Sequence, residues 1–354
     1  MRKLSELSLG MSEATYHQLP ILSYSVLARY EREGGFKSLP HYWNEMFESG
    51  PRTEALIFGS AVDTLCTHPD PWTAYSTEFH VADLPDVPDK AKQVIDVMVD
   101  RNIKWMDTEN ILAILDEMDY YKNWKPATRI AKLCECDAKE YYDTAVSIRL
   151  TGKTLISREM DERIKLCYGD LYNNVITGNL MFTNPLPKEY GDERFFQLQF
   201  KAELDGVEYK IMCDMITVDH DKKSIHIYDL KTSGKPSYSF KESYLQWGYH
   251  IQSHLYRMVL AEVLKGTEYA DYTIDGFSFI VASKVNDTPL VYHDLSKVFQ
   301  RRPWLRDPRV IGKEISDSYS LQCDEDHPVA VLTRKPLPSD LTDTGFNEIS
   351  FNED

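Results

Sequence analysis

The sequence lacks the long apolar runs and the paired cysteines that mark several classes of protein. No stretch approaches the roughly 18 to 20 apolar residues of a membrane helix, and the opening segment MRKLSELSLG has no apolar core of a secretory signal. The six cysteines are scattered without C-x-x-C spacing, which indicates neither a disulfide framework nor a zinc site. These absences favour a protein that acts inside a cell, away from the membrane, with reduced thiols.

Positive charge is also scarce. The chain has 40 Lys and Arg residues against 56 Asp and Glu residues, a net charge of −16. Because Lys and Arg usually supply much of the affinity for nucleic acid, this balance counts against a broadly basic DNA-binding surface. The charge is uneven, however. Six basic residues face one acid from Lys297 to Lys313, whereas ten acids face two basic residues from Glu314 to Asp354.

The rest of the composition is that of a folded protein. Hydrophobic residues make up 42% of the 354 residues and aromatic residues 12%, enough for one large domain or two smaller ones. We expect a polar leader at 1–20 and a main domain at 21–300 with a helical insertion at about 89–180. A basic loop followed by an acidic tail is expected at 301–354.

Helix and strand patterns follow one another in the order typical of an α/β protein. Start signals at Ser23 and Thr53 open two early helices. Apolar alternation predicts strands at Phe195 to Glu203, Ile274 to Ala282 and Leu290 to His293. The sequence therefore predicts an α/β fold with a mixed central sheet flanked by helices.

Three polar residues stand in the otherwise apolar alternation of the stretch Val207 to Ser233. They are Asp214, Asp229 and Lys231. The two-residue period of a strand places Asp214 on one face with Met212 and Ile216, and places Lys231 on the same face as the second acid. With a polar turn between its halves, the stretch predicts an antiparallel hairpin that carries one acid on each strand.

Two carboxylates beside an ammonium group suit a phosphodiesterase that uses a divalent metal. The carboxylates hold Mg²⁺ or Mn²⁺, the metal activates water and neutralises phosphate charge, and the lysine positions or polarises the nucleophile. Acids and lysines at strand ends are more often solvated or joined in a surface ion pair. An isolated Asp-x-Lys therefore fits both interpretations.

A predicted helix from Ser243 to Lys265 adds two further polar residues. Apolar residues recur along it at steps of three and four, and Gln252 interrupts this core-facing stripe. A buried glutamine needs hydrogen-bond partners, and Tyr256 lies one turn further along the same face.

With Asp214, the Asp229-Leu230-Lys231 triplet and the Gln252-x-x-x-Tyr256 helix in that order, the chain resembles the PD-(D/E)XK nuclease superfamily. More narrowly, it resembles the RecE-type phage exonucleases between about Ser23 and Ser283, with unmatched insertions in the middle. The matching segments are SYSVLARY, PHYWNEMF, ALIFGSAVDTLCTHPDPWTAY, CDMI, YDLKTS and YHIQSHLYR.

This resemblance implies a Mg²⁺- or Mn²⁺-dependent exonuclease that digests duplex DNA ends to leave single strands for recombination. It implies Asp214, Asp229, Lys231, Gln252 and Tyr256 as catalytic residues. It also implies a homo-oligomeric ring and a single-strand annealing protein as a partner. The expected location is the cytoplasm of a bacterial cell, and the gene could be carried by a phage. Some relatives hold an iron–sulfur cluster on cysteines near the C-terminus, but only Cys323 lies there in this chain, so we expect no cluster.

One departure from the family pattern concerns the metal ligands. Where such exonucleases typically have a histidine in a Gly-x-x-x-His motif, this chain has Gly59-Ser60-Ala61-Val62-Asp63. Gly59 would let the helix lie close to the sheet, and the resemblance then implies Asp63 as a metal ligand with Asp214 and Asp229. The alternative is a small packing residue beside an exposed acid.

The basic segment offers a candidate lining for a DNA channel. Its members are Lys297, Arg301, Arg302, Trp304, Arg306 and Arg309. The lysine and the arginines could contact DNA phosphates, and the tryptophan could stack on a nucleobase or a sugar. Alternatively, the same residues pair with acids on an ordinary surface. Pro303 and Pro308 predict a stiff loop here rather than a helix.

Two further interpretations of the whole chain stay open. One is a nuclease-like protein that binds or scaffolds DNA with weak or no catalysis. The other is an endonuclease or a nuclease specific for single strands. The intact set Asp214, Asp229 and Lys231 favours an enzyme over a retired site.

Overall fold

The computed structural model describes residues 3–36, 53–285, 288–294 and 305–322. The chain divides into two compact units. One combines Met1–Arg52 with Asn174–Asp354, and the other is Thr53–Asn173. The first unit contains the central sheet, so we call it the sheet unit; the second is the helical unit.

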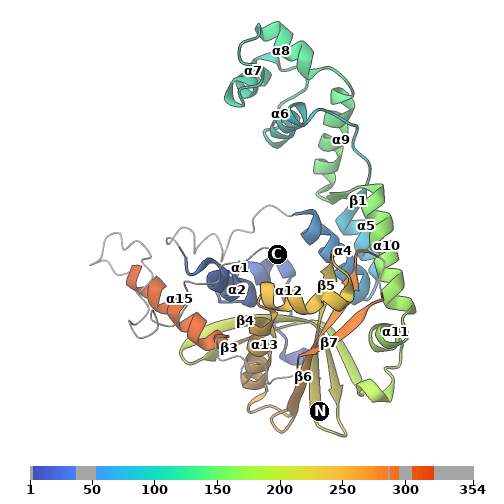
Figure 1. The fold of residues 1–354 in the computed structure, drawn as a ribbon, viewed down its shortest axis with the longest axis vertical. Helices are drawn as coiled ribbons and strands as arrows, with labels where there is room; N and C mark the ends of the chain where they lie inside the picture. Colours follow the sequence, from blue (N-terminus) through green and yellow to red (C-terminus); the bar gives the residue numbers. More distant parts are fainter. Residues whose placement is uncertain (1–2, 37–52, 286–287, 295–304, 323–354) are drawn as a thin grey trace, which may run out of the picture. The chain divides into compact units, whose positions relative to one another are not determined.

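The sheet unit is built on a five-stranded mixed sheet in the order β3-β4-β5-β6-β7 (Figure 1). Its strands are β3 (Glu193–Leu204), β4 (Val207–Asp219), β5 (Ser224–Ser233), β6 (Thr273–Ser283) and β7 (Leu290–Asp294). Neighbouring strands run antiparallel except β5 and β6, which are parallel. The β4–β5 hairpin and the strands β3, β6 and β7 that the alternation predicted are confirmed.

Helices cover this sheet because their apolar stripes need a buried surface. α13 (Tyr249–Leu264) packs on β3, β4 and β6, and both α2 (Tyr24–Glu33) and α15 (Pro308–Gln322) contact α13. The shared core includes fully buried side chains from helix and strand alike, such as Leu27, Leu255 and Phe279. The other short elements are η1 (Leu4–Leu7), α1 (Glu13–Gln18), α11 (Val175–Met181), η2 (Lys188–Tyr190), η3 (Ser237–Ser239) and α12 (Phe240–Gln246).

The single helix expected from Ser243 to Lys265 is wrong in one respect. It is two helices, α12 and α13, which meet at Trp247 and Gly248. Gly248 has φ 70°, a left-handed conformation that glycine adopts at little cost and that ends the helical path of the chain. The break leaves Trp247 44% exposed at the junction.

Two expectations for the ends of the sheet unit are also corrected. The expected polar leader is part of the core, since Leu4 has no exposed surface and Lys210 on β4 donates hydrogen bonds to the carbonyls of Tyr16, His17 and Leu19. The stretch after Pro308 is a helix, α15, rather than a loop. Proline suits the first turn of a helix because its fixed φ is helical and its missing N–H has no partner there anyway.

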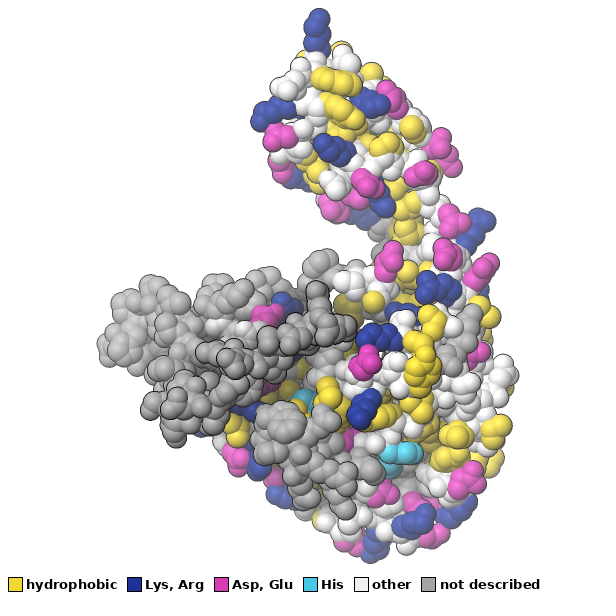
Figure 2. All heavy atoms as spheres, viewed as in Figure 1, with side chains coloured by type: hydrophobic (Ala, Val, Ile, Leu, Met, Phe, Trp, Pro, Cys, Tyr) yellow, Lys and Arg dark blue, Asp and Glu magenta, His cyan; other side chains and the backbone are white. Residues whose placement is uncertain are grey.

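The helical unit is made almost entirely of helices. They are α4 (Glu54–Thr67), α5 (Pro71–Glu78), α6 (Asp89–Asp100), α7 (Thr108–Glu117), α8 (Pro126–Leu133), α9 (Ala138–Thr151) and α10 (Arg158–Asn173), with a short parallel pair β1 (Phe79–Val81) and β2 (Thr154–Ile156). The α6 to α9 segment has its own core, which includes Ile95, Met98 and Leu115. On its visible face, Lys and Arg, Asp and Glu, and hydrophobic side chains are intermixed (Figure 2). Every helix in the described ranges is too short or too polar to span a bilayer.

Candidate active site

The two predicted acids lie where neighbouring strands part. The β4–β5 ladder runs from Asp219 and Ser224 to Met215 and Tyr228, where it stops. One further step in the same register places Asp214 opposite Asp229. Instead of a main-chain partner, the Leu230 N–H finds the Asp214 carboxylate, to which it donates a 2.7 Å hydrogen bond. The carboxylate thereby accepts a hydrogen bond from a backbone N–H that has no partner on β4 once the ladder has ended.

A change of phase in the apolar pattern marks the same place. On β4 the core residues are Tyr209, Ile211 and Cys213, and then Ile216 and Val218, so the alternation skips one residue at Asp214. On the neighbouring strand β3 the register passes from Phe196 opposite Met215 to Leu198 opposite Cys213, and Gln197 between them has φ 53°. The expectation that Met212, Asp214 and Ile216 share one face is therefore wrong, because the face changes within this run. Such irregularities commonly re-aim side chains beside functional sites.

Asp229 is the centre of the cluster. Its side chain is 4% exposed and lies between two partners. Lys231 Nζ is 2.5 Å from Asp229 Oδ2, and Gln252 Nε2 on α13 donates a 2.5 Å hydrogen bond to Asp229 Oδ1. A buried carboxylate of this kind needs both a counter-charge and hydrogen-bond donors. The structure thus brings Asp214, Asp229, Lys231 and Gln252 together.

Lys231 is held under an aromatic ring. Its Nζ lies 5.2 Å from the centre of the Tyr249 ring, and the lysine side chain is 21% exposed. Burial by itself favours the neutral amine, but the neighbouring Asp229, Tyr249 and Asp214 outweigh it, so the pKa of Lys231 is raised. Lys231 is therefore protonated at neutral pH in this arrangement, which suits it to neutralising negative charge.

Tyr256 lies one turn beyond Gln252 on α13 and is 8% exposed. Its ring meets Phe277 edge to face at 5.7 Å. Burial raises the pKa of the Tyr256 phenol well above its usual range, and Tyr16 and Asp229 add to the effect. Tyr256 thus stays neutral and fills space behind the acids.

The donor set can be compared with the needs of a divalent cation. Mg²⁺ prefers oxygen ligands and is commonly held by one or two carboxylates together with water and substrate phosphate. Asp214 and Asp229 provide the carboxylates. Gln252 Oε1 is buried beside them without a hydrogen-bond partner among the described residues. A buried oxygen left in this state costs about 1 to 3 kcal/mol, and a cation or its bound water would relieve that cost. The residues present fit Mg²⁺ or Mn²⁺.

The third predicted metal ligand lies elsewhere in the chain. Asp63 is on α4 of the helical unit, one turn after Gly59. Thr53 caps this helix by accepting a hydrogen bond from the Leu56 N–H, so the predicted helix start is confirmed. That Asp63 joins Asp214 and Asp229 at a metal stays a prediction.

The predicted DNA-binding segment is only partly described. Lys297, Arg301, Arg302 and Trp304 lie outside the described residues. Arg306 and Arg309 are described, and both are paired with carboxylates. The Arg306 partners are Glu31 at 3.2 Å and Glu314 at 2.6 Å, and the Arg309 partners are Asp307 at 2.9 Å and Asp205 at 3.6 Å. Any contact of these two arginines with DNA stays a prediction and would compete with these ion pairs.

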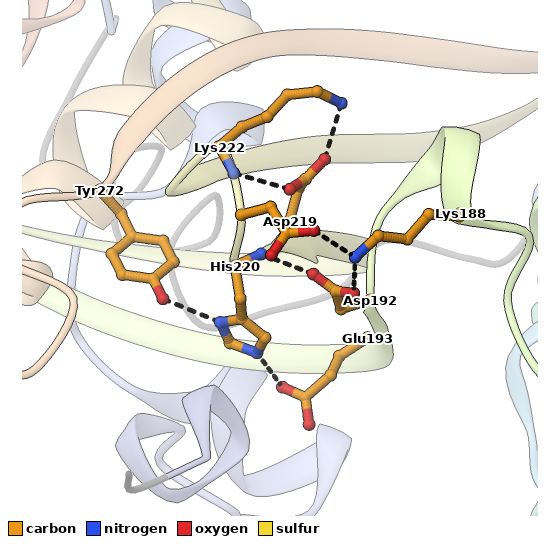
Figure 3. Close-up of polar contacts among 8 residues, drawn as sticks. Lys188, Asp192, Glu193, Asp219, His220, Lys222 and Tyr272 are labelled. Atoms are coloured by element: carbon orange, nitrogen blue, oxygen red, sulfur yellow. Dashed lines mark hydrogen bonds and ion pairs between the residues drawn. The ribbon is translucent and has the colours of Figure 1, made fainter.

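A separate acidic cluster surrounds the β4–β5 turn (Figure 3). One carboxylate oxygen of each of Asp192, Asp219 and Asp221 lies within 4.8 Å of the others. Lys188 pairs with both Asp192 and Asp221, and Lys222 pairs with Asp219 at 2.7 Å. The hydrogen bonds from the Lys222 side chain and backbone lower the pKa of Asp219. Two lysines thus offset most of the charge of the three acids, and their ion pairs fasten the turn.

A second polar network, which sequence reasoning missed, crosses the sheet. His226 on β5 contacts Asp275 at 2.9 Å and Ser278 at 2.7 Å on β6, and the Ser278 hydroxyl contacts His293 on β7 at 2.8 Å. The order of Asp, His and Ser is that of a hydrolytic triad. Ser278 has no exposed surface, however, so it cannot reach a substrate. The network joins three strands.

Comparison with known proteins gives little more. Neither protein-family models nor curated proteins match the chain. Among solved structures, a crystal structure named "Putative exonuclease", from Eubacterium rectale, matches with a TM-score of 0.44 and 14% identity, over 97% of this chain and 99% of that one. A likeness at this level carries no argument about function.

Proposed function

We propose that this protein is a metal-dependent nuclease of the PD-(D/E)XK type that hydrolyses DNA phosphodiester bonds, acting as an exonuclease on duplex ends. The observation that carries the proposal is the convergence of Asp214, Asp229, Lys231 and Gln252 at the point where β4 and β5 part. The resemblance of the sequence motifs to RecE-type exonucleases supports the same chemistry and supplies the preference for DNA ends.

Each residue has a task that follows from its surroundings. Asp214 and Asp229 provide anionic oxygens that would hold Mg²⁺ or Mn²⁺, which when bound activates water and neutralises charge on the phosphate. Gln252 fixes the Asp229 carboxylate by its hydrogen bond. Lys231 stays protonated, so it would stabilise the negative charge that builds up on the phosphate oxygens during hydrolysis.

The net charge of −16 does not oppose this proposal by itself. Several acids are cancelled locally by lysines, as in the cluster of Asp192, Asp219 and Asp221. Phosphate affinity depends on the field at the contact surface, because charges more than about 10 Å apart are screened at ordinary salt. A few cations near the acids can therefore hold a strand that the whole protein repels.

The test is digestion of end-labelled linear and closed circular duplexes with Mg²⁺, with Mn²⁺ and with a chelator. We expect metal-dependent release of nucleotides from the linear duplex alone. Asp214→Ala and Asp229→Ala should lower the rate by at least about a thousandfold, since each removes a metal ligand. Asp221→Ala, which changes an exposed acid on the same hairpin, should digest at the parental rate.

Each other outcome has a defined meaning. Cutting of the circular duplex identifies an endonuclease. Digestion of single strands alone identifies a single-strand nuclease. DNA binding without digestion under any metal identifies the nuclease-like binding protein. Parental digestion by both Asp214→Ala and Asp229→Ala refutes the assigned site.

A further inference from the structure

A row of aromatic and basic side chains leads away from Lys231 along the surface of the sheet unit. Lys231 Nζ lies under the Tyr249 ring, and the Tyr249 and Tyr24 rings are 6.3 Å apart. The Tyr24 hydroxyl donates a 2.8 Å hydrogen bond to the Trp247 carbonyl. Arg32 completes the row, with its guanidinium 5.2 Å from the centre of the Trp247 ring.

The α12–α13 break puts Trp247 in reach of α2. Gly248, with φ 70°, turns the chain at the junction and leaves Trp247 partly exposed, while Tyr24 at the start of α2 fixes its carbonyl. Arg32 is in the last turn of the same helix α2. The cation–π contact therefore joins an exposed arginine to the ring of a residue whose backbone is held in place, and it limits the rotamers of the arginine side chain.

Unlike the neighbouring cations, Arg32 has no carboxylate as an ion-pair partner among the described residues. Arg29, also on α2, pairs with Glu33 at 2.7 Å, and Arg306 pairs with Glu31. Lys231 is neutralised by Asp229. Arg32 is exposed, and within the described parts of the chain no carboxylate pairs with it. Its charge and its planar set of N–H donors remain available to an anion.

We propose that Arg32, positioned by Trp247, binds a backbone phosphate of the DNA strand next to the phosphate that is cleaved at Asp229 and Lys231. This inference rests on the proposed nuclease function and adds a substrate-binding residue to it. A guanidinium group matches a phosphate with two parallel hydrogen bonds, a geometry that lysine does not offer. Electrostatic coupling supports the placement, because Arg32 and Lys231 both act on the phenols of Tyr24 and Tyr249.

A purely structural role for the pair makes a different prediction. Arg32 would then stabilise the C-terminal end of α2 and its contact with α12, as cations near helix C-termini commonly do. Its removal would lower the melting temperature and leave DNA affinity unchanged. Phosphate binding predicts the reverse, since an exposed cation adds little to folding and a charge-assisted hydrogen bond adds much to binding.

The experiment measures the affinity of the full chain for a short fluorescent duplex, with Ca²⁺ in place of Mg²⁺, over a series of salt concentrations. Arg32→Ala should weaken binding about tenfold or more and reduce the slope of log affinity against log salt by about 0.9, the value for one lost phosphate contact. Arg29→Ala is the matched control, because it removes the same charge from the same helix. It should leave the slope unchanged.

The remaining variants test the part played by Trp247. Trp247→Ala should weaken binding in the parent but not in the Arg32→Ala background, because it acts only by positioning Arg32. Trp247→Phe should keep most of the affinity, and Arg32→Lys should restore the salt slope without the full affinity. With Mg²⁺, Arg32→Ala should raise KM for duplex while kcat and the hydrolysis of bis(p-nitrophenyl) phosphate, which has no neighbouring phosphate, stay at the parental values.

The inference and the proposed function can fail separately. Parental affinity and salt slope in Arg32→Ala overturn the inference, and so does an equal loss in Arg29→Ala, which would reflect net charge alone. Absence of metal-dependent digestion by the parent refutes the nuclease proposal, and with it the assignment of the bound phosphate to the strand being cleaved.

Discussion

Removal of the Lys231 ammonium group should destabilise the protein, because it leaves the carboxylate of Asp229 buried without its cation. In Lys231→Met the aliphatic part of the side chain is kept, but Asp229, 4% exposed, loses the cation 2.5 Å away. Breaking a buried ion pair from one side typically costs about 3 to 5 kcal/mol, because the other charge stays buried and unpaired. Lys231 itself is 21% exposed, so water can partly replace it, and we expect about 3 kcal/mol.

Calorimetry measures this cost directly. For a unit of this size, about 3 kcal/mol corresponds to a fall in Tm of roughly 6 to 12 °C. The double variant Asp229→Asn/Lys231→Met should recover most of the loss, since the carboxylate in direct contact with the lost ammonium group then carries no charge. Lys201→Met is the control. It changes an exposed lysine 3.5 Å from Glu208, and a surface pair of that kind contributes about 1 kcal/mol at most.

The same variants report on the metal without any assay of cleavage. In Lys231→Met the acids Asp214 and Asp229 have lost their counter-charge, so a divalent cation should bind there more readily. A ligand at a hundredfold excess over its Kd stabilises a folded protein by about 2.7 kcal/mol. Because the Kd for Mg²⁺ should be lower in Lys231→Met, the same Mg²⁺ concentration should raise Tm more in that variant than in the parent. The double variant should respond far less. A Lys231→Met protein that melts like the parent, or a double variant no more stable than Lys231→Met, would refute this account of the site.

Three further predictions concern other parts of the chain. Burial lowers the pKa of His250 and of His254 to about 4, against 6.5 for an exposed ring, so the unfolded chain takes up these protons first. Stability from these rings is therefore complete above pH 6.5 and falls between pH 6.5 and about 4, by up to about 3 kcal/mol for the buried His250 and by less for the more exposed His254. In urea titrations across this range His250→Gln or His254→Gln should flatten the fall, and an unchanged fall in both variants would count against this account. Gly312→Ala should destabilise the sheet unit by about 1 to 3 kcal/mol in urea, because its Cβ would lie 2.0 Å from the Tyr209 hydroxyl oxygen. Gly234→Ala, which meets no atom within 4 Å, should be neutral, and an equal effect of both would count against this packing. Asp63→Asn should weaken Mg²⁺ binding about tenfold by calorimetric titration if Asp63 is a metal ligand, whereas Asp70→Asn should not, and unchanged binding in Asp63→Asn excludes it from the ligands.

Much of the sheet unit could be predicted from the local sequence pattern, because the apolar residues on the buried face of a strand recur at every second position. The β4–β5 hairpin and the strands β3, β6 and β7 follow from that alternation. The contact between Asp229 and Gln252 also follows indirectly, since a glutamine in an apolar helical stripe needs a buried partner. The sequence could not say that this partner is Asp229 without the resemblance.

The missed features depend on backbone geometry or on distant partners. The break at Gly248 was hidden because Leu245 and Tyr249 keep the spacing of one continuous helix. The phase change at Asp214 could not be predicted, because the residues on both sides of it are apolar. The pattern therefore does not show which face of β4 is buried. The burial of the first segment could not be predicted from its own sequence. Leu4 and Tyr16 are buried by strands almost two hundred residues away, which no local window contains. The helical unit begins at Thr53, before the expected insertion, because α4 packs with α5 and α10.

The docking of the first residues onto β3 and β4 has a consequence for how the chain is made. On the ribosome, Leu4, Leu22 and Leu27 emerge long before the strands that bury them, with the entire helical unit synthesised in between. Lys210, whose ammonium group holds three carbonyls of the early segment, appears only after that delay. The nascent chain therefore carries apolar side chains without their core for many seconds, given synthesis at about 5 to 20 residues per second. The N-terminal segment therefore offers apolar side chains to a chaperone at the ribosome exit for as long as this delay lasts.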